Sequence, residues 1–206
     1  MNPGRLVIAT GNPGKLREYE ELLGAAGFEV VGCDTRVEET GSTYAENATL
    51  KAMTALEETG LPSLGDDSGI EVDALAGYPG LQSARLGSTQ VERTAILLGM
   101  LEGRPRPWTA RFTCTIAAAA PGRPIRTFEG ERRGEVVPEW KGEAGFGYDP
   151  VFLVLEVGQT FGQMGRAEKH RWSHRGAAIK ALLESRWLEA PPPGGAPPAR
   201  RNEPVG

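Results

Sequence analysis

Two adjacent carboxylates stand within an apolar stretch of the sequence. Asp66 and Asp67 follow an apolar run and are themselves followed by Ser68 and a glycine. Two like charges side by side in a core need a cation or several hydrogen-bond donors. Mg²⁺ is one such cation, because it takes oxygen ligands and is usually held by one or two carboxylates together with substrate phosphates. The alternative is a solvated turn, since all of these residue types favour turns.

A second acidic pair, Glu38 and Glu39, precedes a predicted helix. Residues 43–46 have the Thr-x-x-Glu spacing of a capping box, which predicts a helix that begins there and runs to about residue 59. Asn47 and Lys51 are four residues apart on that helix and therefore share one face. That polar face could line a cleft, because small alanines on the other side would let the helix lie close to its neighbour. The alternative is an ordinary solvated face.

The chain opens with the pattern strand, glycine-rich turn, helix. Residues 6–9 form a short apolar run that predicts a buried strand, Asn12 is a candidate N-cap, and Pro13 suits the first helical position. Backbone N–H groups and the positive helix end would then converge on one point, which can bind an anion, and Lys15 adds a positive charge. A P-loop is excluded, because that motif needs a glycine at the position of Ala9. The alternative is a plain connecting turn.

Further polar groups gather in the last third of the chain. Phe146 and Asp149 lie in a segment with two glycines, which can present both side chains with little backbone obstruction. Ser173 is a candidate N-cap for a final helix that reaches about residue 188. His174 and Arg175 would then lie at a helix N-terminus, where cationic side chains are unfavourable unless an anion is present. This conflict favours a functional role for both residues.

The hydrophobic periodicity predicts a mixed α/β protein. Residues 108–116 alternate between apolar and polar, which is the pattern of a half-buried strand, and short turns after it favour antiparallel pairing. The opening strand–helix pattern instead suggests parallel neighbours, so one extended sheet could run between two lobes. The other predicted elements are strands at 28–33, 125–129, 134–137 and 151–157 and a helix at 93–101.

Composition narrows the functional class. The 206 residues carry a net charge of −4, which argues against non-specific nucleic-acid binding because such binding depends on neutralising phosphates. Cys33 and Cys114 have no metal-ligand spacing and read as small buried residues. With no signal peptide and no apolar run of membrane-spanning length, we expect a cytoplasmic protein without membrane contact. We expect one domain over residues 1–190 and a disordered Pro- and Gly-rich tail over 191–206.

Five motifs together carry a family resemblance. They occur in this order: TGNPGK, EETGSTYAENATLKA, LGDDSGIEVDAL, FGYDPVF and SHRGAAIKAL. The sequence resembles the inosine triphosphate pyrophosphatase family, the HAM1-like noncanonical purine NTP pyrophosphatases. The resemblance implies an α/β fold with an elongated mixed central β-sheet flanked by helices, two lobes with a deep active-site cleft, and a homodimer. It also implies hydrolysis of ITP, dITP and XTP to the monophosphate and pyrophosphate, with Mg²⁺ as cofactor.

The resemblance also assigns roles to matched positions. Asp67 would be the general base that takes a proton from the attacking water, and Glu38 with Asp67 would hold Mg²⁺, with Glu39 as the register alternative. The implied substrate-binding residues are Thr10, Gly11, Asn12, Pro13, Gly14, Lys15, Ser68, Phe146, Gly147, Tyr148, Asp149, Lys169, His174 and Arg175.

Within this set, the turn from Thr10 to Lys15 would hold phosphates, with Ser68 nearby. Phe146 would stack on the purine, and Asp149 could accept a hydrogen bond from its edge. His174 and Arg175 could donate to the O6 atom of hypoxanthine or xanthine but would face an amino donor in adenine, and such a buried mismatch discriminates strongly.

Two other readings compete with this one. The first is a Maf-like nucleotide pyrophosphatase that acts on pyrimidine or modified nucleotides. The second is a non-catalytic nucleotide-binding module that keeps the pocket. Asp67 counts against the second reading, because a sensor could lose the general base freely.

Overall fold

The computed structural model describes residues 4–189. Its strands form one seven-stranded sheet in the order β2-β1-β3-β4-β5-β6-β7, in which β1 pairs in parallel with β2 and β3 and the other pairs are antiparallel. The tail predicted for 191–206 lies outside the described residues. The strands are β1 (Arg5–Ala9), β2 (Glu29–Cys33), β3 (Ser63–Val72), β4 (Trp108–Ala119), β5 (Arg126–Val136), β6 (Phe152–Val154) and β7 (Gln159–Thr160).

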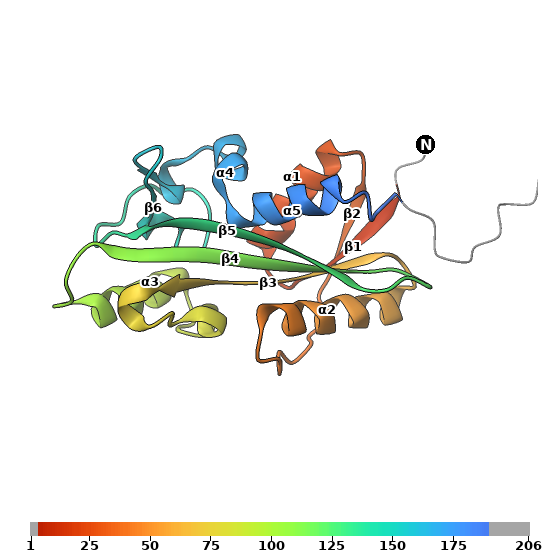
Figure 1. Ribbon diagram of the computed structural model, residues 1–206, viewed down its shortest axis with the longest axis horizontal. Helices are drawn as coiled ribbons and strands as arrows, with labels where there is room; N and C mark the ends of the chain where they lie inside the picture. Colours follow the sequence, from red (N-terminus) through yellow and green to blue (C-terminus); the bar gives the residue numbers. More distant parts are fainter. Residues whose placement is uncertain (1–3, 190–206) are drawn as a thin grey trace, which may run out of the picture.

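Helices cover both faces of this sheet. Figure 1 shows α1, α4 and α5 on one face and α2 and α3 on the other, so the long strands β3, β4 and β5 lie between two helical layers. The mixed α/β fold predicted from the sequence is confirmed. The helices are α1 (Pro13–Ala25), α2 (Tyr44–Thr59), α3 (Gln90–Leu101), α4 (Arg166–Trp172) and α5 (His174–Glu184), with short 3₁₀ helices at Asp73–Leu75, Gly80–Gln82, Asp149–Val151 and Phe161–Gln163.

Each predicted N-cap begins a helix of the structure. The Asn12 side chain accepts hydrogen bonds from the first N–H groups of α1, at 2.8 Å from Gly14 and 3.1 Å from Lys15. Thr43 caps α2 and Ser173 caps α5 in the same way. These caps fix where α1, α2 and α5 start, and the starts of α1 and α5 carry residues of the predicted site.

Several boundaries differ from the sequence-based predictions. The Asp-Asp-Ser-Gly segment is not a turn but the middle of β3, where it pairs with β4. The strands predicted at 125–129 and 134–137 are one strand, because residues 130–133 stay paired with β4 across the charged stretch. The strand predicted at 151–157 is shorter, α5 ends at Glu184 rather than near residue 188, and α4 was not predicted.

The core has two parts, which correspond to the two predicted lobes. One apolar cluster lies where α1 and α5 cover β1 and the neighbouring halves of β3, β4 and β5, and it includes Ile8, Tyr19 and Ile179. The other lies around α3, β6 and the opposite halves of the same long strands, and it includes Leu97 and Phe152. Strands β3, β4 and β5 contribute to both clusters and therefore join the lobes.

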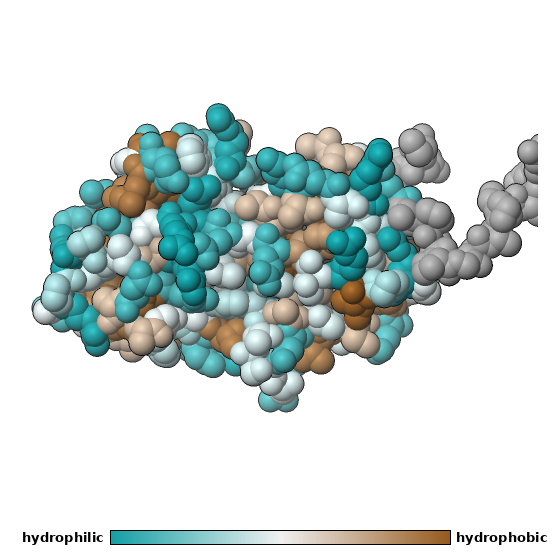
Figure 2. Space-filling model, viewed as in Figure 1, coloured by the Kyte–Doolittle hydropathy of each residue, from teal (hydrophilic) through white to brown (hydrophobic). Residues whose placement is uncertain are grey.

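The surface and the cysteines add little to the functional picture. Figure 2 shows that hydrophilic residues dominate one face and that apolar residues form small separate patches on it. No helix among residues 4–189 is long and apolar enough to cross a membrane. Cys114 is buried and Cys33 half-buried, and both are free thiols.

Candidate active site

Two neighbouring cavities adjoin the β1–α1 turn and the middle of β3. The larger also reaches the start of α5, and the smaller is closed by the segment before α2. The larger has a volume of about 460 Å³ and the smaller about 240 Å³. They share the lining residues Gly11, Asn12, Lys15, Ser68 and Ala84. Every substrate-binding residue implied by the family resemblance lines the larger cavity except Thr10, which lines the smaller one. The five motifs, which are dispersed in the sequence, therefore meet in one place.

Asp66 is the centre of a buried polar network. Its carboxylate contacts the Lys15 ammonium and accepts from Arg175 Nε at 2.8 Å, from the Tyr19 hydroxyl at 2.9 Å and from the Cys114 thiol at 3.2 Å. Burial alone would raise the pKa of Asp66, but the charges of Arg175 and Lys15 outweigh it and hold that pKa well below its usual range. Asp66 is thus an ionised anchor for these two cations, a role that the predicted site did not include.

Asp67 faces the other side of β3 and has a different environment. Its Oδ2 accepts from Asn47 Nδ2 at 2.9 Å, its Oδ1 accepts from the Ser68 N–H at 3.0 Å, and the Lys51 ammonium lies 3.7 Å from Oδ1. Burial raises the pKa of Asp67, and the opposing charges of Lys51 and Lys15 do not fully cancel that effect. A carboxylate with raised proton affinity at the wall of a cavity is a candidate general base.

The structure changes which member of the acidic pair before α2 is the candidate metal ligand. Glu39 lines the smaller cavity together with Asp67, whereas Glu38 is exposed and does not line it. Successive side chains of an extended segment point to opposite sides, so only one member of the pair can face Asp67. Glu39 contacts the Lys51 ammonium through Oε1 and accepts from Arg85 Nη2 at 2.8 Å through Oε2.

The donor set around Lys51 suits a hard cation. Its ammonium lies among oxygens from Glu39, from Asp67 and from the backbone carbonyl of Asp66, which accepts at 2.8 Å. Within residues 4–189, no three His, Cys, Asp or Glu side chains gather as a metal cluster. A divalent cation here would rest on two carboxylates and complete its shell with water or phosphate, as Mg²⁺ usually does.

Phe146 and its neighbours line the larger cavity. The Phe146 ring packs on the backbone of Gly14, where an added Cβ would lie 2.6 Å from Cδ1 of the ring. The Lys169 ammonium lies 4.4 Å from the ring centroid. Asp149 Oδ2 accepts from the Phe146 N–H at 2.7 Å and from Lys169 Nζ at 2.6 Å, so this carboxylate orders the loop that carries the ring. The nearby Tyr148 hydroxyl donates to a backbone carbonyl at 2.7 Å.

His174 lies at the start of α5 as a neutral ring. It stacks on Phe112 with the ring centroids 4.6 Å apart and an interplanar angle of 9°. Burial, and then the positive charge of Arg175, lowers the pKa of His174 well below its usual range. Its Nδ1 atom is buried without a hydrogen-bond partner among the described residues. The imidazole therefore brings hydrogen-bonding capacity to the larger cavity without a charge.

Carboxylates of the protein itself compensate the charge of Arg175 at this helix N-terminus, where the sequence predicted an unfavourable cation. Its Nη1 donates to Glu18 at 2.7 Å and its Nη2 to the Ser68 hydroxyl at 2.9 Å, in addition to the Nε contact with Asp66. Glu18 also contacts the Lys169 ammonium at 2.6 Å. Burial would raise the pKa of Glu18, but Arg175 and Lys169 lower it to about 2. Glu18 was not among the predicted site residues.

Comparison with known proteins agrees with this assembly of motifs. The model of the Ham1 family matches residues 6–185. The dITP/XTP pyrophosphatase of Gloeobacter violaceus is 50% identical over 180 residues, which are 86% of this chain and 92% of that protein. The dITP/XTP pyrophosphatase of Thermus thermophilus is 46% identical over 198 residues, which are 92% of this chain and 94% of that protein.

Solved structures show the same fold. The Ham1 protein of Staphylococcus aureus superposes with a TM-score of 0.78 at 35% identity, covering 90% of this chain and 100% of that one. A HAM1 protein from Coxiella burnetii gives a TM-score of 0.77 at 36% identity, covering 90% and 99%. A family match over most of the chain and relatives of this identity place the sequence unambiguously: this chain belongs to the Ham1 family.

Proposed function

We propose that this protein hydrolyses the noncanonical purine nucleoside triphosphates ITP, dITP and XTP to the monophosphate and pyrophosphate, and so removes them from the nucleotide pool. The observation that carries this proposal is the Asp67 carboxylate, which faces the smaller cavity beside two lysines while the larger cavity offers an aromatic ring. The names of the relatives, dITP/XTP pyrophosphatases, support the same substrates.

The triphosphate would lie where the cavities join. Lys15 belongs to both cavities, Lys51 lines the smaller one, and the positive end of the α1 dipole lies beside them. A polyphosphate needs this concentration of positive charge, because catalysis of such displacements is mainly positioning and charge neutralisation. Thr10, Gly11 and Asn12 form the turn against which the phosphates would rest.

Glu39 and Asp67 would hold Mg²⁺, because their carboxylates already face a cationic group at one point. When bound, Mg²⁺ would neutralise phosphate charge and help to fix the triphosphate in place. Asp67 would accept the proton of the attacking water as the anhydride between the α and β phosphorus atoms is cleaved.

The purine would stack on Phe146 in the larger cavity. His174 is the better candidate for the donor to O6, because each donor nitrogen of Arg175 already has one protein acceptor. Arg175 could add only the remaining hydrogens of Nη1 and Nη2. Adenine presents an amino group where these bases present O6, so it would leave two donors facing each other.

One assay tests this proposal. Purified protein is incubated with Mg²⁺ and ITP, XTP, GTP or ATP, and phosphate is measured separately from pyrophosphate. We expect pyrophosphate from ITP and XTP at a kcat/KM at least ~100-fold above that for ATP. Release of orthophosphate, or a preference for pyrimidine or modified nucleotides, would contradict the proposed reaction.

Other properties implied by the resemblance remain proposals. We propose a single two-lobed domain over residues 1–190, a homodimer and a cytoplasmic enzyme with no nucleic-acid or membrane partner. Light scattering of the purified full chain tests the dimer.

A further inference from the structure

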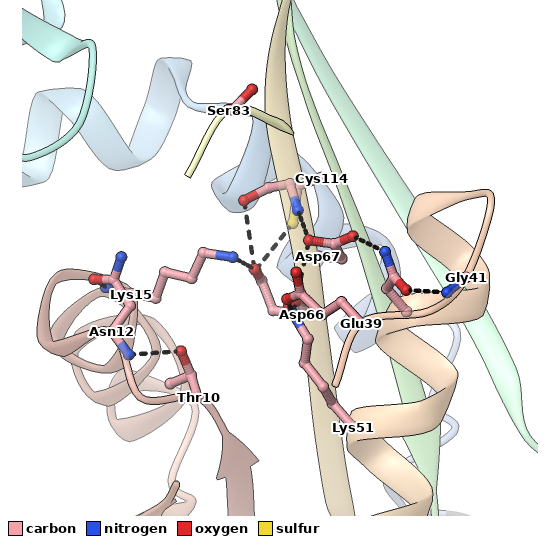
Figure 3. A network of polar contacts seen from close by, with 12 residues as sticks. Thr10, Asn12, Lys15, Glu39, Gly41, Lys51, Asp66, Asp67, Ser83 and Cys114 are labelled. Carbon is pink, nitrogen blue, oxygen red and sulfur yellow. Dashed lines mark hydrogen bonds and ion pairs between the residues drawn. The ribbon is translucent and has the colours of Figure 1, made fainter. Parts of the chain in front are cut away.

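The Lys51 ammonium occupies the place that suits a divalent cation. It contacts Glu39 Oε1, lies 3.7 Å from Asp67 Oδ1 and donates to the Asp66 carbonyl at 2.8 Å. Figure 3 shows Lys51 reaching up from α2 toward Glu39 and the two aspartates, while Lys15 reaches Asp66 from α1. The Lys51 side chain is largely buried, with 12% of its surface exposed. An ammonium at this point and a dication on the same oxygens would exclude each other.

Other groups fix the carboxylates in this orientation. Arg85 Nη2 donates to Glu39 Oε2 at 2.8 Å, and Asn47 Nδ2 donates to Asp67 Oδ2 at 2.9 Å. Each carboxylate thus has one oxygen held by another side chain and the other directed at Lys51. Asn47 is itself held, because its Oδ1 accepts from the Gly41 N–H at 2.8 Å. These partners would keep Glu39 Oε1 and Asp67 Oδ1 in place when the ammonium leaves.

We propose that Lys51 blocks the metal position against a free divalent cation and releases it when a triphosphate offers the ammonium other acceptors. Lys51 is then a positioning residue that couples metal binding to nucleotide binding. The inference rests on the proposed function for its second half, because only a polyphosphate substrate supplies those acceptors. Its physical basis is competition: two cations cannot share the same few oxygens at low cost in a half-buried site.

The first test needs no nucleotide. The affinity of the purified full chain for Mn²⁺, used as a spectroscopic substitute for Mg²⁺, is measured by electron paramagnetic resonance. We expect Lys51→Met and Lys51→Gln to bind Mn²⁺ at least ~10-fold more tightly than the wild type, within the usual range of coupling between two ligands. Lys51→Arg keeps the cation and should remain as weak as the wild type. Circular dichroism melts establish that each variant is folded.

Matched variants separate release of the site from a general change in charge. Lys15→Met removes an equal charge from the same cavity, but Lys15 contacts Asp66 rather than Glu39, so we expect a gain of at most ~2-fold. In the Lys51→Met background, Glu39→Gln should abolish the gain, whereas Glu38→Gln should leave it intact. Equal gains from Lys15→Met and Lys51→Met, or no gain from the latter, would overturn the proposal.

The second test measures the coupling itself. Binding of an ITP analogue with a methylene bridge between the α and β phosphorus atoms is titrated calorimetrically with and without Mn²⁺. We expect Mn²⁺ to tighten binding of the analogue to the wild type at least ~10-fold more than to Lys51→Met. The solution complex of Mn²⁺ with the analogue is common to both proteins and cancels. Equal coupling in both proteins would refute the inference. A wild-type protein that does not hydrolyse ITP would refute only the proposed function.

Discussion

Asp66 and Asp67 are neighbours in the chain but lie in opposite electrostatic environments. Side chains alternate across a strand, so Asp66 faces α1 and α5 while Asp67 faces α2. Two cations on the α1 and α5 side of β3 compensate the charge of Asp66. The carboxylate of Asp67 instead has one ammonium at 3.7 Å and one side-chain amide beside it. The same residue type is therefore a structural anchor at one position and a reactive group at the next.

This difference predicts opposite effects on stability. The pKa of Asp66 is lowered in the folded protein, so its contribution to stability is present above the unfolded pKa and is lost as the pH falls through the folded one. Asp66→Asn leaves Lys15 without its carboxylate and Arg175 with Glu18 alone, which costs about 3–5 kcal/mol for a buried pair. At about 2–4 °C per kcal/mol, the melting temperature at pH 7 should fall by roughly 6–20 °C.

Asp67→Asn should instead raise the melting temperature at pH 7. The pKa of Asp67 is raised by folding, so its ionised form opposes folding above the unfolded pKa, and the opposition fades as the pH falls toward 4. Calorimetry of both variants from pH 4 to 8 measures the two effects side by side. A loss of stability in Asp67→Asn as large as that in Asp66→Asn would mean that the two carboxylates are equivalent anchors.

Asp67 also gives the kinetic prediction at this scale. Asp67→Asn should keep nucleotide binding but lose on the order of 10²-fold or more in kcat, because the amide accepts no proton from water. In the wild type the base works only when ionised, so kcat should fall as the pH drops through the pKa that Asp67 has in the Mg²⁺-bound complex. Stopped assays with ITP and Mg²⁺ across pH 4–8 measure both. Turnover near the wild-type value in Asp67→Asn would remove Asp67 from the base role.

At the scale of elements, two glycines bring the helices onto the sheet. A Cβ added to Gly65 in β3 would lie 2.0 Å from the Ala48 carbonyl of α2, and one added to Gly130 in β5 would lie 2.1 Å from the His174 carbonyl of α5. In both cases the obstacle is backbone, so the helix itself would have to move. These two contacts set the height of Lys51 over Asp67 on one face and of His174 over the larger cavity on the other.

Alanine substitutions at these two glycines should change kcat and base preference separately. Overpacking costs about 1–3 kcal/mol in either case. Gly65→Ala shifts α2, so we expect kcat to fall with little change in the preference for ITP over ATP. Gly130→Ala shifts the start of α5, so we expect that preference to fall more than kcat does. Gly99→Ala in α3 is the control, because an added Cβ there meets nothing within 4 Å and a helical glycine-to-alanine change is neutral or stabilising. Identical kinetic changes in the first two variants would contradict this division.

Local signals predicted these elements better than they predicted the site. Asn12, Thr43 and Ser173 mark helix starts because a cap needs only its own neighbours in the chain. The strand through Asp66 was not predictable in this way, because the cations that allow a buried carboxylate there come from positions 51 and 109 residues away. A turn is the usual local structure for that sequence, and only the tertiary fold overrides it.

Side-chain direction was the other quantity that sequence could not supply. Motif matching found the acidic pair before α2, but only the extended backbone decides that Glu39 faces Asp67 and Glu38 faces solvent. Glu18 was hidden for the same reason, since its partners Lys169 and Arg175 lie at the far end of the chain. The residues of the five motifs were predictable, whereas the residues that orient them required the structure.

At the scale of the whole molecule, the site lies where the two lobes share their strands. β3 carries Leu64 in one apolar cluster and Ile70 in the other, with Asp66 and Asp67 between them. β4 and β5 likewise contribute to both clusters. Separating the lobes would therefore break three long strands and expose the charged network at the same time, so neither lobe has an independent boundary.

This continuity predicts one cooperative unfolding transition. Differential scanning calorimetry should give a single peak with equal calorimetric and van't Hoff enthalpies, and Tyr and Trp fluorescence should change at the same temperature. A ligand of the native state stabilises whatever unfolds with its site. Inorganic pyrophosphate with Mg²⁺ should therefore move the whole peak to higher temperature, because at 100 times its Kd it adds about 2.7 kcal/mol to the free energy of unfolding. Two peaks, with only one of them moved by pyrophosphate, would show that the lobes unfold separately and that the shared strands do not couple them.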